Sequence, residues 1–449
     1  MLQPSSINEM EEGMKNRTDK HVAAADAKTT DFQTSTCVYL GYMKMAVNCK
    51  TASHEPSTDG DIQSTTSQND DHANQPRDPH TIGKKINEYQ ALMSLIKGNI
   101  GTGILSMPVV LRYAGLWTGF TMIIVSGILS TYLMHVLLRT ANAVQQRHNW
   151  DRSKMDYAET AFLVLKYGPE RLRKPKGKLN SMRVVTYLSG LANICTAIGM
   201  ILIFIYLFTS GLHSIYEFPA VTNFNGLLIA FSIVMFSFEG ISLVLPIQSK
   251  MIDPTGYGLP FGVLTTGMII VICMNVAVGF YGFLKFGEES EGSITLNIPQ
   301  VPYWFAPVKP LFIIAMFVSY LLQYYVPAQI FSRLMEKLTC HHEASGRRRY
   351  INLKLMRISL VIFSYAAAVL IPRLDLLLSL IGSLAGSTLA FILPATLEII
   401  FLWPNRQQIS WFWLTVFTKH IIFISIGLLS CFGGLIATII QIIEAFHSK

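Results

Sequence analysis

Two short glycine-containing segments interrupt apolar runs that are long enough to cross a lipid bilayer. Residues 98–103 read GNIGTG and precede Pro108, and residues 237–242 read SFEGIS and precede Pro246. Because no water reaches the hydrocarbon core, backbone groups freed by such a break must be covered by protein or must line an aqueous cavity. Two interrupted spans in one chain are typical of the binding site of a secondary transporter. A solute site framed by the two breaks is therefore our leading hypothesis.

The first break offers groups suited to a ligand with a carboxylate. Its glycines can leave helical geometry without a steric penalty, and they carry no side chain that would exclude a ligand. The half-helix that follows points the positive end of its dipole at the gap, where a carboxylate would accept charge-assisted hydrogen bonds. Asn99 and Thr102 add polar side chains. The alternative is that these glycines only allow close packing between helices.

The second break carries a carboxylate, Glu239, among apolar neighbours. An ionisable side chain at that depth marks a substrate, ion or proton path by default, so Glu239 is the candidate proton-coupling residue. The alternative is a structural carboxylate paired with a backbone amide or with a lysine. Phe238 is either a ligand-covering ring or ordinary packing. The candidate substrate-binding residues are Gly98, Asn99, Ile100, Gly101, Thr102, Gly103, Phe238, Gly240 and Ser242.

Other polar residues in the apolar runs are weaker candidates. Lys97 adjoins the first break, either as a counter-charge for the carboxylate or as a side chain that snorkels to the interface. Ser379, Ser383 and Ser387 recur four residues apart and share one helical face. Small polar faces usually pack helices together, so packing is favoured over a solute path. Glu398 is interpreted as a boundary residue near the end of its helix.

The composition is that of a polytopic integral membrane protein. The 449 residues are 51% hydrophobic and 14% charged, against about 25% charged for a soluble domain. Apolar stretches have the length of about 17–25 residues that a hydrocarbon core requires. This predicts an all-α helical bundle with nine spans, near residues 91–111, 117–138, 184–208, 226–247, 259–283, 308–331, 355–371, 376–402 and 415–441.

Loop charges predict the orientation. The loops after the second span and before the seventh are rich in lysine and arginine, whereas the intervening outer loops are not. By the positive-inside rule, the N-terminus is cytosolic and the net charge of +8 is a topology signal rather than a nucleic-acid surface. Residues 1–87 are polar and are predicted to be a disordered cytosolic tail that could bind cytosolic partners. Residues 88–449 form the transmembrane domain.

No sequence pattern indicates a cofactor, a metal or an enzyme. Cys340-His341-His342-Glu343 are adjacent residues in a basic loop, and adjacent side chains seldom ligate one ion. No GxxxxGK[ST] phosphate loop is present, so an ATP-driven pump has no support. No nucleophile–base constellation is apparent. We expect the partners to be protons, small solutes and the lipid bilayer.

Several longer motifs carry a family resemblance. They are residues 95–105 with Met107-Pro108, 113–115, 155–157, 238–241, 244–246, 323–327 and 381–383. With these motifs the chain resembles the proton-coupled amino acid transporters of the amino acid/auxin permease (AAAP) family over most of residues 88–441. The resemblance implies an inverted-repeat (LeuT/APC-like) fold of two five-helix repeats plus an eleventh helix. It also implies electrogenic symport of a small neutral amino acid with a proton at the plasma or lysosomal membrane.

The chain departs from that family pattern at two places. Ser94 stands where well-known members have a histidine linked to proton coupling. After residues 155–157 the family continues to a third and a fourth helix, whereas this chain passes through a basic loop to a segment similar to the fifth. Nine spans in place of eleven indicate a shortened form. The alternative function is therefore a non-transporting or transport-impaired short isoform that acts as an amino acid sensor or regulatory membrane protein.

Overall fold

The computed structural model describes residues 85–148, 150, 156–167, 185–209, 211–299, 303–338, 346–371, 373–407 and 411–447. These residues are helical apart from short connections, and the one β-type contact among them is an isolated bridge between Ile86 and Met251. Residues 1–84 of the predicted cytosolic tail and the Cys340–Glu343 cluster lie outside the described residues.

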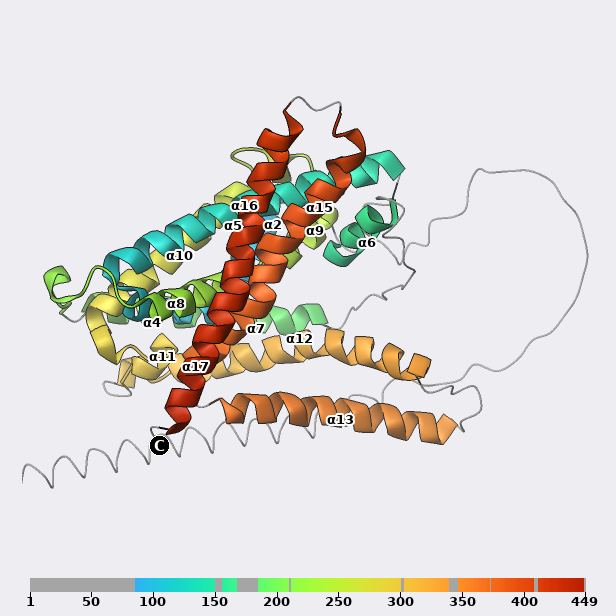
Figure 1. The fold of residues 1–449 in the computed structure, drawn as a ribbon. Helices are drawn as coiled ribbons and strands as arrows, with labels where there is room; N and C mark the ends of the chain where they lie inside the picture. The colour runs from blue at the N-terminus through green and yellow to red at the C-terminus, as the bar shows by residue number, and fades with distance from the viewer. Residues whose placement is uncertain are drawn as a thin grey trace, which may run out of the picture. The chain divides into compact units, whose positions relative to one another are not determined.

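Helices of very different length follow one another along the chain (Figure 1). The α-helices are α2 (Glu88–Asn99), α3 (Thr102–Leu105), α4 (Met107–Ala114), α5 (Leu116–His148), α6 (Tyr157–Tyr167), α7 (Val185–Thr209), α8 (Phe224–Ser237), α9 (Ile241–Lys250), α10 (Val263–Phe286), α11 (Ile294–Asn297), α12 (Val308–Leu338), α13 (Gly346–Leu370), α14 (Leu374–Ile381), α15 (Leu393–Leu402), α16 (Thr418–Leu428) and α17 (Gly434–His447). The π-helical segments are η7 (Gly382–Gly386), η8 (Thr388–Ile392), η10 (Trp413–Phe417) and η11 (Leu429–Gly433). Short 3₁₀ turns are η3 (Ile215–Glu217), η4 (Gly256–Gly258), η5 (Gly287–Glu289), η6 (Tyr303–Phe305) and η9 (Trp403–Asn405).

Seven helical stretches in the described part are long and apolar enough to cross a membrane. They coincide with seven of the nine predicted spans, which confirms a polytopic helical membrane protein but not the count of nine. The first predicted span is divided among α2, α3 and α4, each too short to cross alone. The third predicted span is α7, in which only Ile194–Thr209 is found as an apolar helix, too short to count among the seven. The inverted repeat stays a prediction.

The chain divides into two compact units, which we describe separately. Unit 1 contains Phe317–Leu370, the second part of α12 and all of α13. Within it the Tyr320 hydroxyl and the Ser364 hydroxyl are 2.8 Å apart, and the Tyr324 hydroxyl donates to the Arg357 carbonyl oxygen at 2.6 Å. Unit 2 contains the other described helices, including both glycine-containing segments.

The helices of unit 2 run alternately between two ends. At one end, which we call the entry end because α2 begins there, the Ile86 amide donates to the carbonyl of Lys250, the last residue of α9, at 2.9 Å. There too the Arg147 guanidinium at the end of α5 lies 4.3 Å from the centre of the Phe401 ring in α15. At the opposite end, the Tyr113 hydroxyl of α4 meets α14 and α17. Successive long helices therefore cross unit 2 in opposite directions.

Small residues let the helices of unit 2 pack closely. A β-carbon on Gly382 would lie 1.9 Å from the Ser232 carbonyl oxygen of α8. The Ser379 and Thr438 hydroxyls are 2.7 Å apart, and the Ser387 hydroxyl donates to that of Ser430 at 2.6 Å. All these serines are buried. The serine face of residues 379–387 thus packs helices together, which is the favoured interpretation of its spacing.

Candidate functional site: two interrupted helices in contact

The first helix is interrupted where the glycine spacing predicts. α2 ends at Asn99, and Ile100 and Gly101 leave helical geometry with ψ angles of 85° and −148°. The Ile100 amide still donates to Ile96 at 2.8 Å, whereas the amides of Thr102 and Gly103 open a new helix and have no intrahelical acceptor. No hydrogen bond from these two amides to another described group is present. Two backbone donors are therefore free at the break.

The second helix is interrupted in the same way. α8 ends at Ser237, Phe238 and Gly240 have ψ angles of 20° and 4°, and α9 begins at Ile241. The amides of Ile241 and Ser242 open α9 without an intrahelical acceptor, and none of the described groups accepts from them. Pro246 inside α9 has no N–H, which leaves the Ser242 carbonyl without its helical partner. Free backbone donors therefore lie at the start of α9.

The two interruptions contact each other directly. A β-carbon on Gly240 would lie 2.0 Å from Asn99 Oδ1, and one on Gly103 would lie 2.6 Å from the Ser237 α-carbon. A β-carbon on Gly98 would lie 2.1 Å from Leu243 Cδ1. α2 therefore packs on α9, and α3 packs on the end of α8. Only glycine allows these approaches without displacing a neighbour.

One buried polar atom at this contact has no partner. Asn99 is 4% exposed; its Nδ2 donates to the Leu95 carbonyl at 2.9 Å, but its Oδ1 accepts no hydrogen bond from the described residues. Nearby Ser237 is satisfied, because its hydroxyl donates to Asn275 Oδ1 at 2.7 Å. A buried acceptor without a donor is unusual in a folded protein and requires an explanation.

Glu239 lies in the unwound part of the second break and is half-buried. Its carboxylate makes no hydrogen bond or ion pair with another described residue. Lys97 is exposed and does not pair with it, which agrees with the snorkelling alternative for this lysine. Ser94, at the family's histidine position, is exposed and donates to the Gln90 carbonyl at 2.7 Å. The Glu239 carboxylate is thus available to an external partner.

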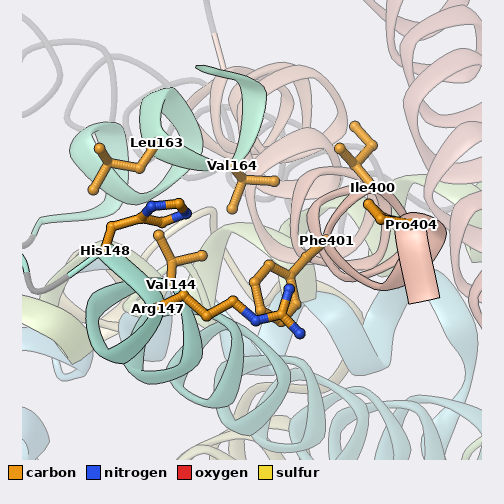
Figure 2. Close-up of a pocket in the computed structure, with 8 residues that line it drawn as sticks. All are labelled: Val144, Arg147, His148, Leu163, Val164, Ile400, Phe401 and Pro404. Atoms are coloured by element: carbon orange, nitrogen blue, oxygen red, sulfur yellow. The ribbon is translucent and has the colours of Figure 1, made fainter. Parts of the chain in front are cut away.

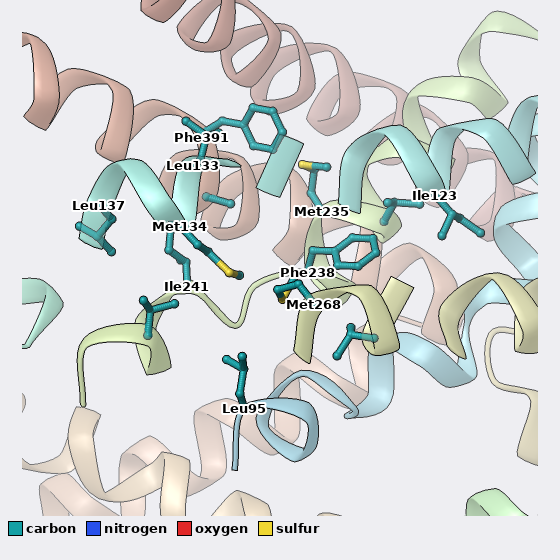
Figure 3. Packing of buried hydrophobic residues seen from close by; sticks show 14 of the residues in the cluster. Leu95, Ile123, Leu133, Met134, Leu137, Met235, Phe238, Ile241, Met268 and Phe391 are labelled. Atoms are coloured by element: carbon teal, nitrogen blue, oxygen red, sulfur yellow. The ribbon is translucent and has the colours of Figure 1, made fainter. Parts of the chain in front are cut away.

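The remaining predicted residues differ in their surroundings. Ile100, Gly101 and Thr102 are partly exposed, and a β-carbon on Gly101 would have open space within 4 Å. Ser242 is exposed. Phe238 is fully buried in the apolar cluster around the second break (Figure 3), which corresponds to the packing alternative for this ring. The open face of the site is therefore formed by the first break and the start of α9.

A separate pocket of unit 2 contains none of the predicted residues. It lies at the entry end, between the ends of α5 and α15 and helix α6 (Figure 2). Its lining residues are Val144, Arg147, His148, Leu163, Val164, Ile400, Phe401 and Pro404. Among the described residues there is no group of three or more metal-ligating side chains.

Sequence reasoning did not find a charged cluster at the end opposite the entry end. Asp375, 3% exposed, accepts from the Tyr113 hydroxyl at 2.5 Å and from Arg373 at 2.7 Å, and its Oδ2 lies 3.7 Å from Arg112 NH2. The Tyr113 hydroxyl also lies 3.1 Å from Gln441 Oε1. The only sequence signal was an acid immediately before an apolar run. Its partners are distant in sequence, so spacing could not reveal them.

The geometry defines a polytopic helical membrane protein in which two apolar helical stretches are interrupted and in contact. The sequence profile of the family described as "Transmembrane amino acid transporter protein" matches residues 84–174 and 175–440. The chain therefore belongs to this family, as the motif resemblance predicted. The profile match divides at residues 174 and 175, within the basic loop where two family helices are expected.

Two relatives cover most of the chain. One is a "Probable amino acid transporter skat-1" from Caenorhabditis elegans, 24% identical over 431 residues, covering 82% of this chain and 93% of the relative. Another is a "Proton-coupled amino acid transporter-like protein pathetic" from Drosophila melanogaster, 25% identical over 422 residues, covering 81% of this chain and 86% of the relative.

Proposed function

We propose that this protein is a secondary transporter that moves small neutral amino acids across a membrane by proton symport. The observation that carries the proposal is the contact of the Asn99 amide with Gly240, which joins the two interrupted helices. Free amides at the starts of α3 and α9 provide hydrogen-bond donors for a carboxylate. The unpaired Asn99 Oδ1 provides an acceptor for an ammonium group. Together these groups complement a zwitterion.

The charges at the two breaks favour a neutral side chain on the substrate. Apart from Glu239, residues 98–106 and 237–246 contain no charged side chain. A third charge on the ligand would be left without a partner at membrane depth, which is unfavourable by several kcal/mol. Glycine, alanine and proline are therefore the substrates to test.

We assign proton coupling to Glu239. Its carboxylate is half-buried beside the freed amides and has no partner among the described residues, so it can alternately hold and release a proton without breaking an existing ion pair. The second feature in its favour is the replacement of the family's histidine by Ser94, which cannot titrate.

Alternating access follows from how the half-helices pair. α2 and α9 pack together and are joined at the entry end by the hydrogen bonds of Ile86 with Lys250 and Ile252. α3 and α4 pack with α8 toward the other end. Rocking of one set of helices about the breaks would expose the site to each side in turn. We place the entry end in the cytosol and the protein in the plasma or lysosomal membrane.

The relatives agree with transport, since both carry transporter names and one is named as proton-coupled. They do not favour the alternative of a non-transporting sensor. The proposal is tested with purified protein in liposomes that are alkaline inside and acidic outside. Labelled glycine, alanine or proline should accumulate, and a protonophore should abolish the accumulation. Saturable binding without flux would instead identify the sensor.

A further inference from the structure

A buried imidazole–carboxylate pair joins the last two membrane-crossing stretches. His420 Nε2 of α16 lies 2.6 Å from Glu398 Oε2 of α15. The His420 side chain has no exposed surface, and that of Glu398 is 14% exposed. Glu398 is thus more than the boundary residue that the sequence indicated. A sequence signal was present, because Glu398 and His420 lie on the two arms of a helical hairpin, and such a hairpin places its arms side by side.

The hydrogen-bond partners determine how many protons the pair holds. His420 Nδ1 lies 2.7 Å from the Val416 carbonyl oxygen, which can only accept, so Nδ1 carries a hydrogen. The Nε2–Oε2 contact then requires one more hydrogen, either on an imidazolium or on a neutral carboxyl group. Both forms have zero net charge. Removal of that hydrogen would leave a nitrogen lone pair facing a carboxylate, and the two side chains would have to separate.

We propose that Glu398 and His420 form a proton-binding site distinct from Glu239, whose occupancy controls how tightly α15 and α16 pack. With the proton bound, a short hydrogen bond closes the hairpin. With the proton released, the carboxylate and the imidazole lone pair repel each other and the hairpin loosens. The claim that this site controls transport rests on the proposed function. The claim that the pair binds a proton does not.

Packing connects the pair to the second break. α16 approaches η8 at Gly427, where a β-carbon would lie 2.7 Å from Ile392 Cγ1 and 3.1 Å from Phe391 Cβ. Phe391 belongs to the same buried cluster as Phe238 and Ile241, which flank the second break (Figure 3). α16 and α15 run side by side (Figure 1). A change in the α15–α16 hairpin is therefore transmitted to the helix ends that frame the substrate site.

The pair lies toward the entry end, where the surrounding elements carry several charged groups. The titratable and charged side chains on these elements and those packed against them are Lys419, Tyr132, His135, Arg139, Arg147, His148, Tyr157, Glu159, Lys166 and Cys431, and Arg406 follows α15. His135 Nε2 lies 2.9 Å from the Thr265 hydroxyl. Lys419 and Arg139 lie over the Tyr132 ring, at 5.2 and 6.0 Å. Arg147 lies over the ring of Phe401, beside the pocket of Figure 2. These three cations thus face aromatic rings of α5 and α15.

The first test measures the proton directly and needs no transport. Purified protein labelled with nitrogen-15 histidine is followed by NMR between about pH 5 and 9. The His420 signal is assigned as the one that is absent from the spectrum of His420→Gln. If that variant does not fold, it is assigned as the signal that changes in Glu398→Gln. We expect Nδ1 to stay protonated while Nε2 shifts with pH, and Glu398→Gln to change the midpoint. A His420 signal that is constant over the whole range would overturn the proposal.

The second test measures substrate counterflow in liposomes with equal pH on both sides. In His420→Gln and in Glu398→Gln a glutamine amide can still bridge α15 and α16, but no shared proton remains. We expect the slope of the logarithm of the counterflow rate against pH to fall by about one in each variant, because one proton fewer is bound or released. The double variant should fall no further, because the two residues share that proton. Additive losses, or unchanged slopes, would contradict a shared site.

Ser430→Ala is the matched control. It removes the 2.6 Å hydrogen bond that joins Ser430 of η11 to Ser387, the residue between η7 and η8, without removing a titratable group. This variant should lower thermal stability and leave the slope of log counterflow rate against pH unchanged. If its slope changed as much as in the Glu398 and His420 variants, the pair would have only a structural role. Absence of counterflow in the unmutated protein at every pH would contradict the proposed function, while the NMR titration would still decide the proton site.

Discussion

The side-chain oxygen of Asn99 lies only 2.0 Å from the position that a β-carbon on Gly240 would occupy. The Asn99 side chain is held there by the hydrogen bond from Nδ2 to the Leu95 carbonyl. The contact therefore brings the end of α2 against the start of α9. It also leaves a buried acceptor free at the place where a ligand is expected.

Gly240→Ala should disrupt this contact. The added methyl group meets Asn99 Oδ1, and overpacking of this kind costs about 1–3 kcal/mol. We expect uptake to fall by at least about tenfold and the unfolding temperature in detergent to decrease. Gly211→Ala is the control, because no atom lies within 4 Å of its β-carbon. Equal behaviour of the two variants would show that the contact does not matter.

Asn99→Ala should weaken substrate binding. It removes the free acceptor that we assign to the substrate ammonium, and loss of a hydrogen bond to a charged group costs about 1.5–3 kcal/mol. The KM for alanine uptake should therefore rise by about tenfold or more. Thr140→Val removes a comparable buried local hydrogen bond, 3.0 Å to the Val136 carbonyl, and should leave KM unchanged. The same KM in both variants would show that Asn99 does not bind the substrate.

Glu239→Gln should separate binding from proton coupling. The amide cannot carry the proton, so accumulation driven by a pH gradient should disappear while counterflow at equal pH persists. A gradient of about one pH unit supplies about 1.4 kcal/mol per proton, enough for tenfold accumulation. Glu288→Gln, in an exposed acid between α10 and α11, is the control. Gradient-driven accumulation by Glu239→Gln at the unmutated level would remove this residue from coupling.

Asp375→Asn should destabilise the end of unit 2 opposite the entry end. It leaves Arg373 and Arg112 without their carboxylate, and breaking a buried ion pair costs about 3–5 kcal/mol. We expect the lower part of that range, because the Arg373 side chain is 39% exposed and partly screened by solvent. Glu217→Gln breaks the exposed pair with His213 and should change stability by at most about 1 kcal/mol. The measurement is the thermal unfolding midpoint of each variant. Equal decreases would show that the buried Asp375 contributes no more to stability than the exposed Glu217.

Sequence was sufficient where the signal was local. The glycines at 98, 101 and 103 and at 240 correctly located both helix interruptions, because leaving helical geometry is a property of a few neighbouring residues. The apolar runs located seven long spans for the same reason. The serine face at 379–387 was also readable from its spacing, since helix packing follows residue period.

Sequence was insufficient where partners are distant along the chain. Tyr113 and Asp375 are brought together only by the packing of α4 on α14, and no spacing rule connects them. Glu398 and His420 lie on the two arms of a predictable helical hairpin, but Glu398 alone resembles a boundary residue. Lys97 was a possible partner of Glu239 because each residue lies at one of the two breaks. In the structure Lys97 is exposed and forms no ion pair with the carboxylate.

The most direct measurement is a cryo-electron microscopy map of the protein in lipid nanodiscs with saturating alanine. We predict both helices unwound at residues 100–101 and 238–240, with ligand density between them. Its carboxylate should face the free amides of α3 or α9, and its ammonium group should face Asn99 Oδ1. Two continuous helices at these positions, or alanine density located elsewhere in the molecule, would contradict the account.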